Sequence, residues 1–176
     1  MRPPRGARST PSYATRPWVR GQAPGPVTSG EDHAMHHDEM IGKIQALAQL
    51  PDRGSTERAT QAVLRTLGER LPAGLADHVA AQLSPELAAD LRRPAEFALA
   101  EGRDAGSGER FDLVAFTGRI ADRAGTTEDA ALREAAAVLE VLDAALAPEL
   151  MNKIAAALPV DIGSLLPTGR TTGDPG

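Results

Sequence analysis

An aliphatic pattern that occurs twice limits what this chain can fold into more than any other feature of its sequence. The segment 63–91 aligns without a gap with the segment 138–166, which lies 75 residues later. Eight positions at four-residue spacing are aliphatic in both segments, whereas the positions between them differ freely in charge and size. The repeat therefore describes a packing scheme, and no reactive group repeats with it. The matched positions are Val63 with Val138, Leu67 with Leu142, Leu71 with Leu146, Leu75 with Leu150, Val79 with Ile154, Leu83 with Leu158, Leu87 with Ile162, and Leu91 with Leu166.

The four-residue spacing predicts a series of short helices. Four residues of an α-helix turn through about 400°, so an aliphatic stripe at this spacing drifts by about 40° at each step. Prolines mark the breaks between helices, because proline cannot donate the helical hydrogen bond and suits the first turn of a new helix. Pro72 and Pro148 give the first break in each copy. Pro85, which follows Ser84 as a predicted helix cap, and Pro159 give the second.

Each aliphatic segment begins inside a predicted long helix, and a further predicted helix precedes this long helix in the chain. Apolar residues recur at helical spacing from near Asp38, and a turn signal at 51–54 separates this helix from one predicted to be capped by Ser55. In the second copy Phe116 lies in the matching first helix, and Thr-Thr-Glu-Asp at 126–129 supplies cap chemistry for the next one. We therefore predict an all-α fold, a compact helical bundle of two tandem, internally related units of three to four helices each.

Composition predicts the boundaries of the folded part. The N-terminal segment is rich in Arg, Pro and Gly, so it cannot bury enough apolar surface to offset the cost of ordering and is predicted to be disordered. Met35, just before the first helical pattern, is an alternative to Met1 as the start of translation. The predicted boundaries are 1–34 for the disordered leader, 35–166 for the all-α domain with repeat one at 38–91, a linker at 92–111 and repeat two at 112–166, and 167–176 for a flexible tail.

The linker holds most of the aromatic residues of the predicted domain. Pro94–Glu101 is predicted to form a short helix, and Gly102–Gly108 a flexible loop. Phe97, Phe111 and Phe116 lie in or beside the linker. Aromatic side chains at such a joint usually pack in the core or between repeats, and we favour this role over ligand stacking.

Charge and composition exclude several classes of function. Residues 31–176 carry 14 basic and 24 acidic side chains, and such an acidic body repels phosphate backbones, which argues against nucleic acid as a partner. The chain has no cysteine, so disulfides, thiol catalysis and cysteine zinc sites are excluded. It has no run of 18 apolar residues, so no membrane span is predicted.

The sequence offers little candidate chemistry. Three histidines, His33, His36 and His37, lie among four acidic residues and could ligate zinc or nickel. They lie in an unstructured run without an equivalent in the second copy, however, so we predict no metal site. His78 aligns with Lys153 and is predicted to lie on the surface, and the serines lack the setting of a nucleophile. We predict no catalytic residue, no cofactor-binding residue and no cofactor.

Beyond the packing scheme, the order of motifs resembles a known family. An acidic-capped second helix with aliphatic spacing is followed by a shorter helix that ends in Leu-Ser-Pro in the first copy and in Leu-Pro in the second. This order resembles the bacterial family catalogued as domain of unknown function 2267. The resemblance covers about residues 36–167 and implies an all-α cytoplasmic protein of two related units, with no activity, cofactor or catalytic residue to transfer. The residues that carry it are Asp38, Glu39, Met40, Ala59, Val63, Leu64, Leu67, Leu75, Val79 and Leu83 in the first copy, and Phe116, Val138, Leu139, Leu142, Leu150, Ile154, Leu158 and Pro159 in the second.

Two classes of function remain open. The first is a non-enzymatic cytoplasmic interaction or structural protein with a regulatory or stress-related role, whose partner is an unknown protein and neither nucleic acid nor a membrane. The second is a small-ligand or metal binder that uses a groove between the repeats. An enzyme ranks third, because no acid, base and nucleophile can be assembled from the sequence.

Overall fold

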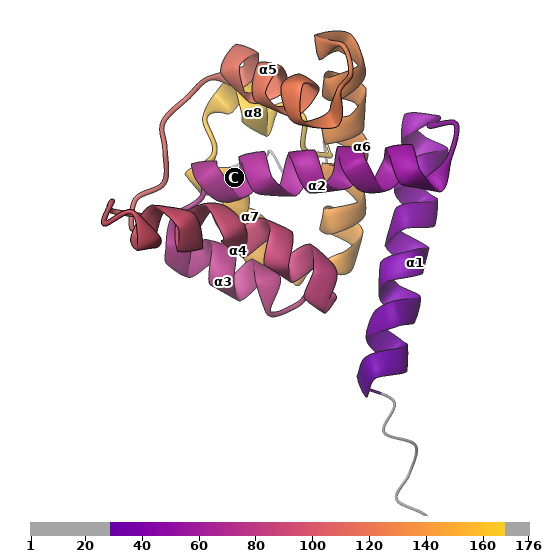
Figure 1. The fold of residues 1–176 in the computed structure, drawn as a ribbon, viewed down its shortest axis with the longest axis horizontal. Helices are drawn as coiled ribbons and strands as arrows, with labels where there is room; N and C mark the ends of the chain where they lie inside the picture. The colour runs from indigo at the N-terminus through magenta and orange to yellow at the C-terminus, as the bar shows by residue number, and fades with distance from the viewer. Residues whose placement is uncertain (1–28, 168–176) are drawn as a thin grey trace, which may run out of the picture.

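A computed structural model of the chain describes residues 29–167, with side chains from His37 onward, and it confirms the all-α prediction (Figure 1). The described residues contain no β-strand. Residues 1–28 and 168–176 lie outside the described residues, so the predictions made for them stay predictions. The helices are α1 (Ser29–Ala48), α2 (Arg53–Arg70), α3 (Ala73–Ala80), α4 (Pro85–Ala100), α5 (Leu113–Ala124), α6 (Glu128–Ala145), α7 (Pro148–Ala157) and α8 (Val160–Gly163).

Helix α1 begins at Ser29, earlier than the predicted start near Asp38. The last residues of the predicted leader, 29–34, are therefore helical.

Helix α2 lies at the centre of the bundle. It runs across the middle of Figure 1, with α5 on one side and α4 on the other, and it also contacts α1 and α6. Helices α1 and α5 each contact both α2 and α6. Three threonines of α2, Thr56, Thr60 and Thr66, are buried by these neighbours. Each hydroxyl donates a hydrogen bond to a carbonyl one turn earlier, at 2.7–2.9 Å, so burial leaves no hydroxyl donor unpaired.

Side-chain caps and prolines set most of the helix ends. Asp52 caps α2 by accepting from the backbone N–H of Ser55 at 2.7 Å, so the predicted cap at Ser55 was wrong by one turn. Thr127 caps α6 as predicted, by accepting from the backbone N–H of Ala130 at 3.2 Å. The predicted proline breaks are confirmed, because α2 ends before Pro72 and α7 begins at Pro148.

Helix α4 continues through Pro94, where the sequence predicts the end of repeat one and a separate short helix. Proline removes one helical hydrogen bond, but packing against α2 compensates for the loss. Leu91 is fully buried, and its backbone carbonyl lies against Gly68 of α2. A Cβ atom placed on Gly68 of α2 would lie 2.2 Å from the carbonyl oxygen of Leu91 and 3.4 Å from Cδ of Pro94. Only a glycine allows the two helices to approach this closely.

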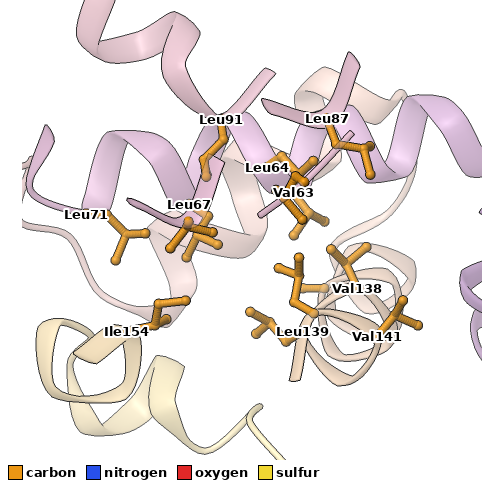
Figure 2. Close-up of a cluster of buried hydrophobic side chains, with 14 of the residues drawn as sticks. Val63, Leu64, Leu67, Leu71, Leu87, Leu91, Val138, Leu139, Val141 and Ile154 are labelled. Carbon is orange, nitrogen blue, oxygen red and sulfur yellow. The ribbon is translucent and has the colours of Figure 1, made fainter. Parts of the chain in front are cut away.

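One hydrophobic core extends through the bundle, from Met40 to Leu166. Figure 2 shows its centre, where side chains of α2 and α4 meet those of α6 and α7, and Val63 lies close to Val138. All sixteen matched aliphatic positions are buried except Leu75, which is half-buried. Leu47 and Leu132, assigned to apolar faces in the sequence, are instead 48% and 37% exposed.

Truncation of Leu67 should destabilise the whole bundle. Leu67 is fully buried on the central helix, so Leu67→Ala loses the transfer free energy of its side chain and leaves a cavity, at a cost of about 2–5 kcal/mol. Calorimetry should record one cooperative transition at a lower temperature, because the core is continuous. Leu47→Ala, at an exposed position, should change the free energy of unfolding by less than about 0.5 kcal/mol. Two separate transitions would show that the halves unfold independently.

The contact at Gly68 predicts opposite effects for two glycine substitutions. Alanine favours helix over glycine by about 1 kcal/mol, so Gly42→Ala in α1, with no atom within 4 Å of the new Cβ, should stabilise the protein. Gly68→Ala should instead cost about 1–3 kcal/mol, because α2 and α4 must move apart. Urea denaturation of both variants measures the difference. Equal stabilisation by the two substitutions would contradict the close approach of α2 and α4.

Candidate functional site

A pocket of about 270 Å³ opens between α1, α2 and α4, and we call it the acidic pocket. Each helix presents residues one turn apart, which places them on one face. Ile41 and Leu87 are buried and form its apolar part, whereas its acidic side chains range from exposed to buried. The lining residues are His37 and Ile41 from α1, Glu57, Thr60 and Gln61 from α2, and Glu86, Leu87 and Asp90 from α4.

Two of the three carboxylates in the acidic pocket are partly neutralised by arginines. Arg53 donates to Glu57 at 2.8 Å and also binds Asp38 of α1. The hydrogen bond from Arg53 and its positive charge hold the pKa of Asp38 below its ordinary value. Arg65 Nε donates to Asp90 Oδ1 at 3.0 Å across α2 and α4. No ion pair within the described part of the chain involves Glu86, so the acidic pocket keeps a negative balance.

His37 and Ser84, which lie far apart in sequence, meet beside the acidic pocket. Their Nδ1 and Oγ atoms are 3.4 Å apart. Ser84 precedes α4 as predicted, but its hydroxyl makes no cap hydrogen bond and is directed to His37 instead. Ser84 is only 2% exposed, so its hydroxyl cannot reach a substrate. The pair is therefore a packing contact rather than a catalytic dyad.

The structure brings together few of the other candidates from the sequence. In the part of the chain that the structure describes, no three His, Asp or Glu side chains are close enough to hold a metal ion. The side chains of His33 and His36 lie outside the described residues. His78 is exposed, as predicted, and Ser164 is exposed and donates to the carbonyl of Asp161 at 2.5 Å.

A second cluster joins α2 to α5 through the linker. Glu69 of α2 accepts from Arg119 of α5 at 2.8 Å and also binds Arg123. Arg119 binds Glu109 of the linker at 2.9 Å, and its guanidinium lies 4.2 Å from the centroid of the Phe111 ring. The cluster therefore fixes the returning linker and α5 against the central helix. Because these charged groups bind one another, the cluster stabilises the fold and does not provide a reactive site.

The aromatic residues only partly follow the prediction of core packing. Phe116 is buried and stacks on half-buried Phe111, with ring centroids 6.4 Å apart. Phe97 is 60% exposed, because it lies on the outer half of α4 beyond the contact with Gly68. It lines a pocket of about 120 Å³ between α2, α4 and the linker, too small for more than a few atoms.

Glu134 of α6 is a buried carboxyl that the sequence analysis did not single out. It is 4% exposed, and its Oε2 atom is sealed from solvent without a hydrogen-bond partner among the described residues. Burial raises the pKa of Glu134, and the neighbouring Arg133 only partly opposes this shift. Glu134 lies four residues before Val138, so it continues the four-residue spacing of the buried aliphatic positions. This spacing is the one sequence signal that predicts its burial.

The fold and the site together define an all-helical bundle with a small acidic pocket. Within the described residues, no helix is long and apolar enough to cross a bilayer. The chain belongs to the family described as uncharacterized conserved protein (DUF2267), whose sequence profile matches residues 37–165. This confirms the family resemblance. No curated protein matches the chain.

The buried carboxyl predicts a pH-dependent difference in stability. The raised pKa of Glu134 means that its contribution to stability is full below the ordinary carboxyl pKa and is lost as pH rises through the folded-state pKa. Glu134→Gln should therefore stabilise the protein relative to wild type by an amount that grows as pH rises from the ordinary carboxyl pKa through the raised folded-state pKa. Melting temperatures across this range test the prediction. Exposed Glu140→Gln on the same helix should show no such trend, and a pH-independent difference for Glu134→Gln would contradict it.

Proposed function

We propose that this chain is a non-enzymatic, cytoplasmic interaction protein with a regulatory role, and that its partner is a protein bound at the acidic pocket. The observation that carries the proposal is the pocket itself, in which buried apolar side chains of α1 and α4 lie beside three carboxylates of α2 and α4. An apolar surface with a few placed polar groups is the usual composition of a binding site. The accessible side chains of the pocket include carboxylates, an amide and an imidazole, but no paired nucleophile and base.

We further propose that the two halves are tandem copies of one unit of bacterial origin. Helices α2 and α6 have the same length of 18 residues and end at the matched positions Leu71 and Leu146. Helices α1 and α5, which precede them, each contact both α2 and α6. The excess of 17 arginines over two lysines fits a GC-rich bacterial gene.

A small cationic ligand is the second candidate. The volume of about 270 Å³ favours a ligand no larger than one amino-acid side chain, since sites for drug-sized molecules span about 300–1,000 Å³. The acidic pocket lies within the first half of the chain, whereas the sequence analysis favoured a groove between the repeats for this function. A side chain of a partner protein fits the available volume and gains further contact area around the rim.

Site-directed crosslinking tests the proposal, because the chain has no cysteine of its own. Gln61→Cys places a photoreactive label on the exposed rim, and Glu140→Cys places the same label on an exposed face of α6. In living cells we expect one discrete protein adduct from Gln61→Cys and none from Glu140→Cys. Adding Glu86→Arg, which reverses a rim charge, should abolish the adduct. Equal adducts from both labels, or an adduct insensitive to Glu86→Arg, would count against a partner at the acidic pocket.

A further inference from the structure

We propose that the acidic pocket binds the guanidinium group of an arginine side chain that belongs to the partner protein. This inference rests on the proposed function and names the chemistry that the partner must present. It depends on three features of the acidic pocket: a buried carboxylate with a free oxygen, a ring of further carboxylates, and an apolar floor.

Asp90 is the central group, because it is 8% exposed and yet keeps one oxygen free. Arg65 contacts it through Nε at 3.0 Å and Nη2 at 2.9 Å, and both contacts end on Oδ1. No hydrogen bond from a described residue ends on Oδ2, and Oδ2 is not among the atoms sealed from solvent, so it is open to the pocket that Asp90 lines. Oδ2 can therefore accept a hydrogen bond from an N–H group of a ligand, and a bond between a charged donor and a carboxylate is among the stronger ones.

The remaining groups distinguish a guanidinium from other cations. Arg53 engages Oε1 of Glu57, which leaves its second oxygen available, and Glu86 has no partner among the described side chains. A guanidinium carries five N–H donors in a planar fork and can reach several carboxylate oxygens at once, whereas an ammonium is a compact point charge. The hydrocarbon stem of an arginine can lie along buried Ile41 and Leu87, as long basic side chains do on apolar surfaces.

The charge of the whole body supports a basic partner. Residues 31–176 carry 14 basic and 24 acidic side chains, so the protein attracts a positively charged surface over distances longer than those of direct contacts. Complementary charge raises the rate of association and disfavours wrong partners.

The test is a nuclear magnetic resonance titration of the full chain with blocked five-residue peptides that carry a central arginine, lysine or citrulline between alanines. Citrulline keeps the shape of arginine without its charge. We expect the arginine peptide to shift the amide signals of Thr60 and Leu87, the lysine peptide to bind more weakly, and the citrulline peptide to lose about tenfold or more in affinity.

Matched variants locate the site. Glu86→Gln, on the exposed rim, should weaken arginine binding several-fold without changing the fold, and Asp90→Asn should weaken it further. Glu140→Gln, which removes an exposed carboxylate elsewhere, should have no effect. Because Glu86→Gln does not touch the Arg65 contact, the test survives if Asp90→Asn fails to fold.

Three results would overturn the inference. The citrulline peptide could bind as tightly as the arginine peptide, or the shifted amides could lie away from the acidic pocket. Alternatively, replacing Arg2, Arg5, Arg8, Arg16 and Arg20 by glutamine could tighten peptide binding about tenfold, which would identify this chain's own N-terminal segment as the occupant. A rim adduct in cells with no preference for arginine peptides would reject only the arginine assignment. Arginine binding without a protein adduct would instead reject the proposed function.

Discussion

Burial of α2 by four other helices is the constraint on which the rest of the structure depends. Burial on several sides leaves only part of α2 in contact with water, so the polar groups on its buried faces need partners within the fold. The threonines of α2 satisfy their own hydroxyls through the backbone, and Glu69 binds arginines of α5. Gly68 has no side chain, which lets the backbone of α4 come into contact with α2. The acidic pocket exists because this tight packing between α2 and α4 opens again towards the start of both helices, where α1 crosses them.

The parts of the fold that depend on local periodicity could be predicted from the sequence. Nearly all of the positions that the aliphatic spacing selects are buried, and prolines mark most of the breaks, because both effects act within one or two helical turns. The continuation of α4 through Pro94 could not be predicted in this way, since it depends on Gly68, which lies on another helix. The start of α1 was missed for a different reason, because Ser29 and the acids after it carry no apolar periodicity.

The candidate site was harder to predict than the core. Its lining residues come from three helices and match no motif. The contact between His37 and Ser84 joins residues separated by 47 positions. One local signal was present, since Glu57, Thr60 and Gln61 form a polar stripe on a helix that is otherwise surrounded by apolar neighbours. A polar stripe on a buried helix indicates either a hydrogen-bonded network or a cavity, and in this chain it borders the cavity.

The contact between α1 and α6 has a consequence for the way the chain is made. Helix α1 leaves the ribosome early, but one of the surfaces that cover it belongs to α6, which ends at Ala145. The N-terminal helices therefore cannot complete their core while the later part of the chain is still being synthesised. At ordinary rates of translation of about 5–20 residues per second, several seconds pass between the synthesis of α1 and that of α6. During that interval the apolar face of α1 lacks one of its native partners.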